Sequence, residues 1–295
     1  MRLFRGAWVA LVTPFTADNQ VNVPVLQDLT EYLLGKGVEG LYLCGLTGQG
    51  MNMSVAERRL VVETVIGQVI KRVPVIVQVG ALAIPDAVEL ARHACSTGAD
   101  GVSSLIPPTY SSKDSLHRYF SAIAGAVPDA PFFPYIYGGQ VDAAELMQSL
   151  LSIPNVAGTK FTSPNMYALQ HISTLRNDDW TVFSGMDEQC IFAAMWGAKG
   201  NIGSTLNLMP GVYREIHKLC QAGDFATAQA FQLRANQVTR VLISFEFMGA
   251  LREALYLLGF DCRQPRLPGT ALAENRRKAL DAALKEVNFS ELANM

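Results

Sequence analysis

One lysine lies near the end of a short apolar segment, Val156–Thr162, whose sequence is V-A-G-T-K-F-T. Its β-branched residues predict a strand. Side chains alternate on a strand, so Lys160 shares a face with Gly158 and Thr162, and the glycine is expected to leave room for a ligand. A charged lysine is costly to bury, so either its head reaches water from an edge strand or the protein uses its amine.

A neutral lysine amine in an apolar setting is a nucleophile toward ketones. It forms a Schiff base, and the resulting iminium accepts electrons during carbon–carbon cleavage. Such chemistry needs burial that lowers the lysine pKa and a nearby group that moves protons. Tyr135 is a candidate, because Phe133, Tyr135 and Tyr137 would share one face of the preceding predicted strand. An aromatic core layer would have the same pattern, so both interpretations stay open.

Predicted strands and helices alternate eight times along residues 1–222. The capping box Ser54-x-x-Glu57 begins one helix, and Pro85 begins the next. Eight such units predict a (β/α)8 TIM barrel, and a doubly wound sheet is the alternative with the same local alternation. The predicted strands are 8–15, 40–44, 74–79, 101–106, 132–137, 156–162, 181–184 and 200–204. The predicted helices are 24–36, 54–71, 85–97, 113–126, 142–151, 165–175, 187–196 and 210–220.

Residues 223–295 lack the alternation and predict helices only, over 224–243, 247–258 and 271–287. A segment rich in glycine and proline, 259–268, separates the last two. We expect a three-helix extension packed on the barrel and not an independent domain.

Active sites of such barrels form at the carboxyl ends of the strands. Lys160 is the only cation among the residues predicted there. The other polar or aromatic candidates are Thr13, Thr47, Gln49, Tyr110, Tyr135, Tyr137, Thr162, Asp187, Glu188 and Ser204.

Composition excludes several function classes. A formal net charge of -2 without a basic stripe argues against a nucleic-acid partner, and no apolar run is long enough for a membrane span. Five scattered cysteines without a C-x-x-C pair predict reduced thiols, most of them buried, in a cytoplasmic protein.

Sequence motifs likewise exclude a metal or a nucleotide cofactor. All four histidines fall in predicted helices without an H-x-x-x-H pair, so no metal is expected. The glycines Gly45, Gly48 and Gly50 lack the order of a dinucleotide-binding motif, and no cofactor is expected.

Together these residues resemble the class I pyruvate-dependent aldolase family that includes N-acetylneuraminate lyase and dihydrodipicolinate synthase. The resemblance extends from Gly6–Phe15 to Pro265–Pro268. Its most specific motifs are Gly45–Gly48, Gly158-x-Lys160 and Gly203-Ser204-Thr205.

The resemblance implies a role for several residues. Lys160 matches the lysine that forms the Schiff base, and Tyr135 is the best match to the tyrosine that moves protons. Thr47 and Gly48 match the pair that holds the pyruvate carboxylate. Tyr110 is similar to a tyrosine that reaches the site of a neighbouring subunit, which implies a homo-oligomer, a tetramer in this family.

Two further motifs resemble the lyases of N-acetylneuraminate. They are Lys160-Phe161-Thr162 and Gly185-Met186-Asp187-Glu188, followed by Ser204. Adjacent carboxylates accept hydrogen bonds from a polyhydroxylated sugar, although Asp187 and Glu188 could instead favour the N-terminus of the following helix. The synthases of the family carry an arginine after the strand-five tyrosine, and the matching loop, 138–140, has none.

The chain departs from the family at three places. Leu46 stands where a serine or threonine is usual, and Gln49 stands where an acid is usual. The loop after Tyr135 is shorter than is common, which leaves Tyr137 as an alternative proton shuttle.

The main hypothesis is a Schiff-base lyase that cleaves N-acetylneuraminate to pyruvate and N-acetylmannosamine. Lys160 and Tyr135 would be catalytic, and the substrate would contact Thr47, Gly48, Thr162, Gly185, Asp187, Glu188, Ser204 and Tyr110. The alternatives are an aldolase for 2-keto-3-deoxygluconate, a 4-hydroxy-tetrahydrodipicolinate synthase, or a barrel that binds a keto acid without turnover, which Leu46 and Gln49 motivate.

Overall fold

Eight parallel strands close into a barrel in sequence order, which confirms the predicted TIM barrel. The computed structural model describes residues 4–139, 141–177 and 180–295. Gln140 of the loop discussed above lies outside the described residues. The strands are β1 (Gly6–Ala10), β2 (Gly40–Leu43), β3 (Val75–Gln78), β4 (Gly101–Leu105), β5 (Phe132–Tyr137), β6 (Gly158–Thr162), β7 (Thr181–Ser184) and β8 (Gly200–Gly203).

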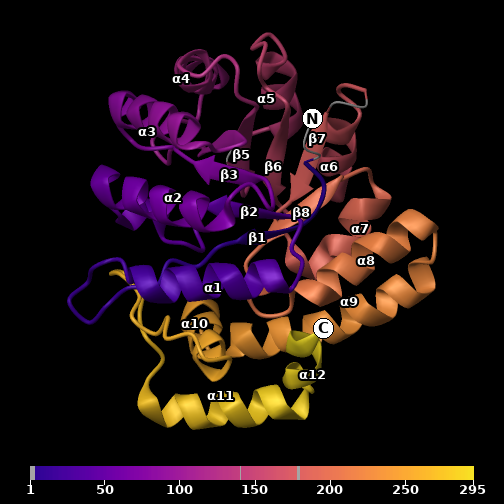
Figure 1. The fold of residues 1–295 in the computed structure, drawn as a ribbon. Coiled ribbons are helices and arrows are strands. Elements are labelled where there is room, and N and C mark those ends of the chain that lie inside the picture. Colours follow the sequence, from indigo (N-terminus) through magenta and orange to yellow (C-terminus); the bar gives the residue numbers. More distant parts are fainter. Residues whose placement is uncertain (1–3, 140, 178–179) are drawn as a thin grey trace.

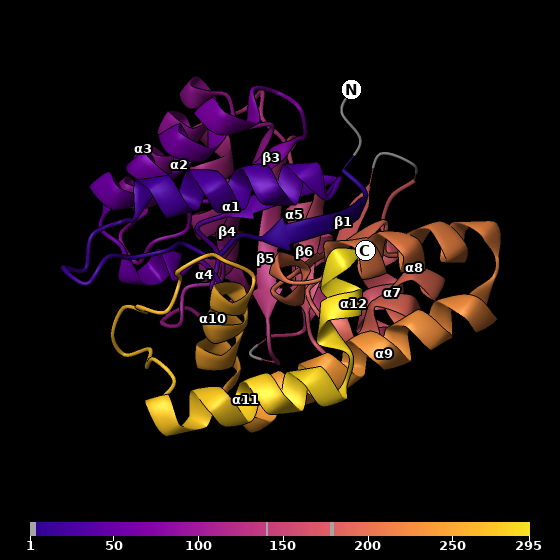
Figure 2. The same ribbon diagram turned by 60° about the horizontal axis from the view of Figure 1, so that its bottom comes forward.

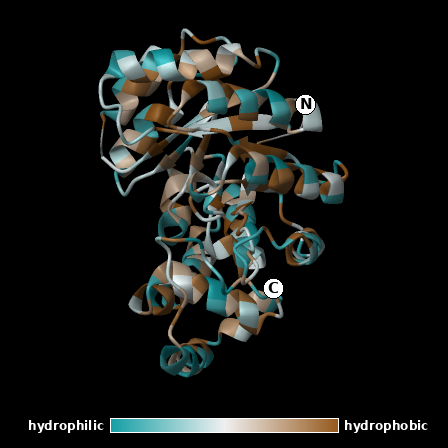
Figure 3. Cartoon of the chain, turned by 90° about the vertical axis from the view of Figure 1, so that its left-hand side faces the viewer, coloured by the Kyte–Doolittle hydropathy of each residue, from teal (hydrophilic) through white to brown (hydrophobic). Residues whose placement is uncertain are grey.

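Helices surround the strands, one after each of them (Figure 1). The capping box at Ser54 and Glu57 is formed as predicted, and most helices mix hydrophobic and hydrophilic residues along their length (Figure 3). The helices are α1 (Val23–Gly35), α2 (Val55–Val69), α3 (Ile84–Thr97), α4 (Lys113–Gly125), α5 (Ala143–Leu150), α6 (Met166–Ser173), α7 (Cys190–Met195) and α8 (Pro210–Ala222). Short 3-10 helices follow β2, β7 and β8 as η1 (Gly50–Asn52), η2 (Asp187–Gln189) and η3 (Thr205–Asn207).

The barrel interior is aromatic at the end where the strands begin. The Trp8 and Phe133 rings both pack against Phe183, with centroids 5.2 and 6.0 Å away. This layer fills the barrel, so ligands can approach Lys160 only from the carboxyl ends of the strands.

Six strands are shorter than the runs that predicted them, and β1 and β6 are two of these. β1 ends at Ala10 and not at Phe15, because the Val12 amide donates to the side chain of Asn207 (3.1 Å) and the chain leaves the sheet there. β6 begins at Gly158 and not at Val156.

Gly158 does not provide the ligand space that was expected of it. Its φ is +153°, and a Cβ there would collide with the backbone of Thr181 on β7. The glycine therefore serves the close approach of two strands, and that expectation was wrong.

Four helices follow the barrel in the described residues, one more than predicted. They are α9 (Phe225–Ser244), α10 (Phe247–Leu257), α11 (Glu274–Glu286) and α12 (Phe289–Asn294). The short α12 was missed because its buried residues, Phe289 and Leu292, span barely one turn. α11 is the most hydrophilic of the four and lies lowest in Figure 3.

This extension, α9–α12, contacts the end of the barrel where the active site was predicted. α10 and α11 lie on the side toward which the arrow of β5 points (Figure 2). Gln232 and Asn236 of α9 donate to the backbone carbonyls of Asp187 and Glu188, each at 3.0 Å. The extension thus helps to fix the loops around the site.

Within the described residues, no helix is long and apolar enough to cross a bilayer. The five cysteines form no disulfide, and Cys44, Cys190 and Cys262 are buried, as predicted.

Candidate active site

Lys160 is buried on the inner face of the barrel and only 5% exposed. Its Nζ lies 4.2 Å from the centroid of the Tyr135 ring and 4.4 Å from that of Tyr42. Burial lowers its pKa to about 7, against an opposing effect of the Asp187 carboxylate. A large fraction of the amine is therefore neutral near pH 7, which is what nucleophilic attack requires.

Of the two tyrosines considered as proton shuttle, Tyr135 lies beside the lysine. Its Cα pairs with that of Lys160 across β5 and β6, whereas Tyr137 pairs with Thr162 and is 49% exposed. Burial raises the pKa of the Tyr135 phenol, so this group is protonated at rest. A phenol in this state can first donate a proton and then accept one.

Thr162 and Gly185 adjoin the same pair. The Thr162 hydroxyl donates to the Tyr135 hydroxyl at 3.4 Å. A Cβ on Gly185 would collide with Thr162 Oγ1 and lie 3.3 Å from Lys160 Cε. Gly185 thus leaves the space that the side chains of Thr162 and Lys160 need. The structure brings these three residues together with Tyr135.

Thr47 and Gly48 lie in the loop after β2. Both residues are buried, and their backbone N–H groups have no hydrogen-bond partner in the described parts of the chain. The Thr47 hydroxyl contacts the Ser204 hydroxyl at 2.6 Å. Unpartnered amides beside two hydroxyls are suited to a carboxylate. Ser204, predicted on the sugar side, lies with this group.

Asp187 and Glu188 are adjacent in sequence but differ in surroundings. The Asp187 carboxylate is 5% exposed and accepts from the Thr205 amide (2.8 Å) and hydroxyl (2.7 Å) and from Asn201 Nδ2 (3.4 Å). Burial raises its pKa to about 6. Glu188 is half-buried, and no hydrogen bond or ion pair engages its side chain within the described residues. Glu188 is therefore the freer acceptor.

Tyr110 is not part of the lysine cluster. It is half-buried in the loop after β4, with its ring 5.8 Å from that of Tyr119. Its predicted role at a neighbouring subunit stays a prediction.

Sequence reasoning missed Tyr42 and the residues that hold Asp187. Tyr42 is in the middle of β2, so it was not among the strand-end candidates, although its place on the inward face could have identified it. Its hydroxyl donates to Ser103 at 3.0 Å. Asn201 Oδ1 accepts from His217 Nε2 at 2.7 Å, because an amide oxygen can only accept. Burial lowers the His217 pKa to about 4, so the ring is neutral and its proton is on Nε2. These contacts join distant segments and leave no local signal.

Nothing in the described residues forms a cluster of three or more metal-ligating side chains. A cavity of about 840 Å³ lies at the other end of the barrel, beside Val156 and Trp180. Its polar residues Asn155 and Arg176 donate to backbone carbonyls. The chemistry is therefore better sought at Lys160.

Comparisons with known proteins agree with this geometry. Residues 3–287 match the model of the dihydrodipicolinate synthetase family. The N-acetylneuraminate lyase of Mus musculus is 31% identical over 97% of this chain and 93% of its own. The 4-hydroxy-tetrahydrodipicolinate synthase of Acidiphilium cryptum is 32% identical over 96% and 98%.

A solved structure is equally similar. The N-acetylneuraminate lyase of Proteus mirabilis superimposes with a TM-score of 0.92 at 31% identity, covering 98% of this chain and all of that one. A family match over nearly the whole chain, with the lysine and the barrel in place, leads to one conclusion: the chain belongs to the dihydrodipicolinate synthetase family of class I aldolases.

Proposed function

We propose that this aldolase cleaves N-acetylneuraminate to pyruvate and N-acetylmannosamine through a Schiff base on Lys160. The observation that carries the proposal is the Lys160 amine, buried between two tyrosine rings with a pKa of about 7. An amine in this state attacks a ketone at neutral pH.

The neutral Lys160 Nζ attacks the C2 ketone, and the Tyr135 phenol donates a proton to the developing carbinolamine oxygen. The oxygen takes its second proton from the lysine nitrogen and leaves as water, which gives the iminium and leaves Tyr135 as a phenolate. The resulting Tyr135 phenolate takes the proton of the C4 hydroxyl, the C3–C4 bond breaks, and its electrons pass to the iminium. N-acetylmannosamine departs, and protonation of C3 followed by hydrolysis releases pyruvate and the free lysine.

The two ends of the substrate would contact opposite sides of the site. Thr47, Gly48 and Ser204 offer two free amides and two hydroxyls to the carboxylate. Glu188 would offer the sugar hydroxyls a carboxylate that has no partner among the described residues, while Asp187 is held by Thr205. Thr162 and Gly185 would adjoin the reacting carbons.

Borohydride trapping tests the covalent step. Incubation with pyruvate and borohydride is expected to add a three-carbon unit to Lys160, detected by peptide mass spectrometry. Unmodified Lys160 in folded protein would refute the Schiff-base mechanism.

A substrate panel with pyruvate release as readout tests the specificity. Glu188→Gln is expected to raise the KM for N-acetylneuraminate about tenfold, because a charged acceptor is lost, and to leave pyruvate trapping unchanged. Equal KM values would remove Glu188 from the sugar site.

A 4-hydroxy-tetrahydrodipicolinate synthase is the second candidate, favoured by the 32% identity to the Acidiphilium cryptum enzyme. The absence of an arginine in the sequence of loop 138–140 speaks against it. Condensation of pyruvate with aspartate semialdehyde, and cleavage of 2-keto-3-deoxygluconate, belong in the same panel.

Binding without turnover is the remaining alternative. Gln49 no longer supports it, because its side chain points to Arg252 and Arg266 and not to the proton pathway. Pyruvate binding with no cleavage of any panel member would favour this alternative.

A further inference from the structure

Arg252 of α10 is a buried cation that no carboxylate neutralises within the described residues. It is 1% exposed, and its guanidinium donates to the carbonyls of Thr13 (3.1 and 3.2 Å) and Cys262 (2.8 Å) and to Gln49 Oε1 (2.9 Å). Burial lowers its pKa to about 10, so it keeps its charge near pH 7. Its four hydrogen bonds go to uncharged oxygens, so the protein solvates this charge without neutralising it.

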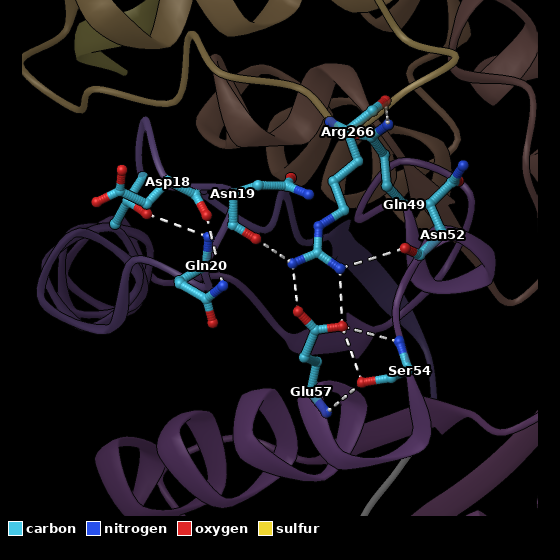
Figure 4. A network of polar contacts seen from close by, with 9 residues as sticks. Asp18, Asn19, Gln20, Gln49, Asn52, Ser54, Glu57 and Arg266 are labelled. Carbon is cyan, nitrogen blue, oxygen red and sulfur yellow. Dashed lines mark hydrogen bonds and ion pairs between the residues drawn. The ribbon is translucent and has the colours of Figure 1, made fainter.

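The neighbouring Arg266 differs in this respect. Figure 4 shows its guanidinium facing the Glu57 carboxylate, and both terminal nitrogens donate to it. Arg266 also donates to the carbonyls of Asn19 and Asn52. Its charge is therefore neutralised within the protein.

Gln49 joins the two arginines, and both the nitrogen and the oxygen of its side-chain amide form hydrogen bonds. Its Nε2 donates to the Arg266 carbonyl (2.8 Å), and its Oε1 accepts from the Arg266 amide (3.0 Å) and from Arg252. A carboxylate at this position would neutralise Arg252 but would lack the donor for the Arg266 carbonyl. Gln49 thus fits this arrangement and leaves Arg252 charged.

Arg252 also donates to two segments next to Gly48, through the Thr13 carbonyl and the Gln49 side chain. The residue that it holds, Thr13, has its hydroxyl 3.1 Å from where a Cβ on Gly48 would stand. Gln49 directly follows Gly48, with a left-handed backbone at φ 52°. One charged side chain therefore fixes both loops that border the free amides of Thr47 and Gly48.

We propose that the carboxylate of the bound keto acid is the counter-charge of Arg252. Gln49 keeps the charge of Arg252 available for it, because its amide oxygen accepts a hydrogen bond without neutralising the arginine. The proposal rests on the function proposed above. It makes Arg252 a determinant of specificity for carboxylate-bearing ketones, acting through its field and through the loops of Thr13 and Gln49.

Gln49→Glu tests this by placing a carboxylate beside Arg252. The measured quantity is the concentration of ketone that half-saturates trapping at Lys160, with pyruvate and with neutral hydroxyacetone. We expect the value for pyruvate to rise about fivefold or more and that for hydroxyacetone to change less than about twofold. Asn52→Asp is the matched control, because Asn52 also donates an amide hydrogen to an extension carbonyl, that of Leu267 at 2.9 Å.

Glu57→Gln changes the charge in the opposite direction and decides the question if Gln49→Glu fails to fold. It frees the charge of Arg266, while glutamine can keep the capping box. We expect pyruvate to half-saturate trapping at about half the concentration or less, with hydroxyacetone unchanged. Parallel changes for both ketones, or no change for pyruvate, would overturn the proposal.

Failure of the proposed function would have a different signature. If wild-type Lys160 is not trapped, calorimetric binding of pyruvate and hydroxyacetone to the same variants replaces trapping. A pyruvate-specific effect of Gln49→Glu would then still support the role of Arg252, and its absence would refute it.

Discussion

Lys160 and Arg252 are both buried cations of this barrel, and their surroundings differ in kind. Lys160 is packed against the rings of Tyr42 and Tyr135, which cannot replace the water that stabilises an ammonium. Arg252 is surrounded by carbonyl and amide oxygens that accept four hydrogen bonds. Burial therefore brings the lysine pKa to about 7 and the arginine pKa only to about 10.

This difference separates two tasks within one site. The lysine must lose its charge to become a nucleophile, so its surroundings offer few acceptors. In our proposal the arginine must keep its charge to attract a carboxylate, and among the described residues its surroundings offer acceptors but no neutralising acid. A substitution at Lys160 or its surroundings should mainly affect nucleophilic attack, and one at Arg252 or its surroundings should mainly affect carboxylate binding.

Lys160→Met should have the largest effect. Removal of the nucleophile is expected to abolish trapping and to reduce turnover by about 10⁴-fold or more, while removal of a poorly solvated amine should raise the Tm. Lys36→Met is the matched control, because Lys36 also lies over a tyrosine ring, that of Tyr32 at 5.5 Å, away from the site. Turnover retained by Lys160→Met would show that another residue is the nucleophile.

Tyr135→Phe should reduce turnover by about 10²- to 10⁴-fold, because the ring that packs on Lys160 remains but the proton donor is lost. Tyr42→Phe is its control, since it keeps a ring at the same amine and loses only the hydroxyl bonded to Ser103. We expect the second variant to stay within about tenfold of wild type in steady-state kinetics. Equal losses would mean that neither hydroxyl is specific to proton transfer.

The position of Lys160 in the barrel could be predicted from sequence, and the contacts of Arg252 could not. A lysine at the end of a β-branched run and eight strand–helix alternations are local patterns, and both the barrel and the burial of Lys160 followed from them. Arg252 lies in a helix with no local motif, and its contacts with Thr13 and Gln49 span 239 and 203 residues. Such pairings depend on how the extension packs.

Several smaller errors have the same origin. The apolar run that begins at Trp8 predicted a strand that continues past the end of β1. The contact at which the chain leaves the sheet, from the Val12 amide to the Asn207 side chain, joins residues 195 positions apart. Gly158 was expected to make room for a ligand, and the backbone of Thr181 fills that room. A local sequence pattern predicts the face of the strand on which a residue lies, but not the distant residue that it contacts across the barrel.

Arg252→Lys should separate the charge of this cation from its geometry. An ammonium keeps the charge but lacks the planar fork that reaches Thr13, Cys262 and Gln49 together. We expect the free energy of unfolding to fall by about 1–3 kcal/mol, measured by urea denaturation with an unchanged m-value. Arg276→Lys, at a half-buried cation over the Phe245 ring, should change it by less than about 0.5 kcal/mol. Similar losses of unfolding free energy in the two variants would show that burial does not make Arg252 more sensitive to this substitution.

Asp187→Asn should have the smallest effect, on the pH dependence of trapping. In wild type the initial rate should rise with pH through about 7, because only the neutral Lys160 amine attacks. The Asp187 carboxylate raises the lysine pKa, so its removal should move the midpoint to lower pH by a fraction of a unit.

This effect of Asp187→Asn requires an ionised Asp187. Since the Asp187 pKa is about 6, the difference between wild type and variant should be present above pH 6 and fade below it. Glu188→Gln, which also removes one carboxylate after β7, should leave the midpoint in place. An alkaline shift in Asp187→Asn would mean that its carboxylate acts on Lys160 through loop geometry and not through its charge.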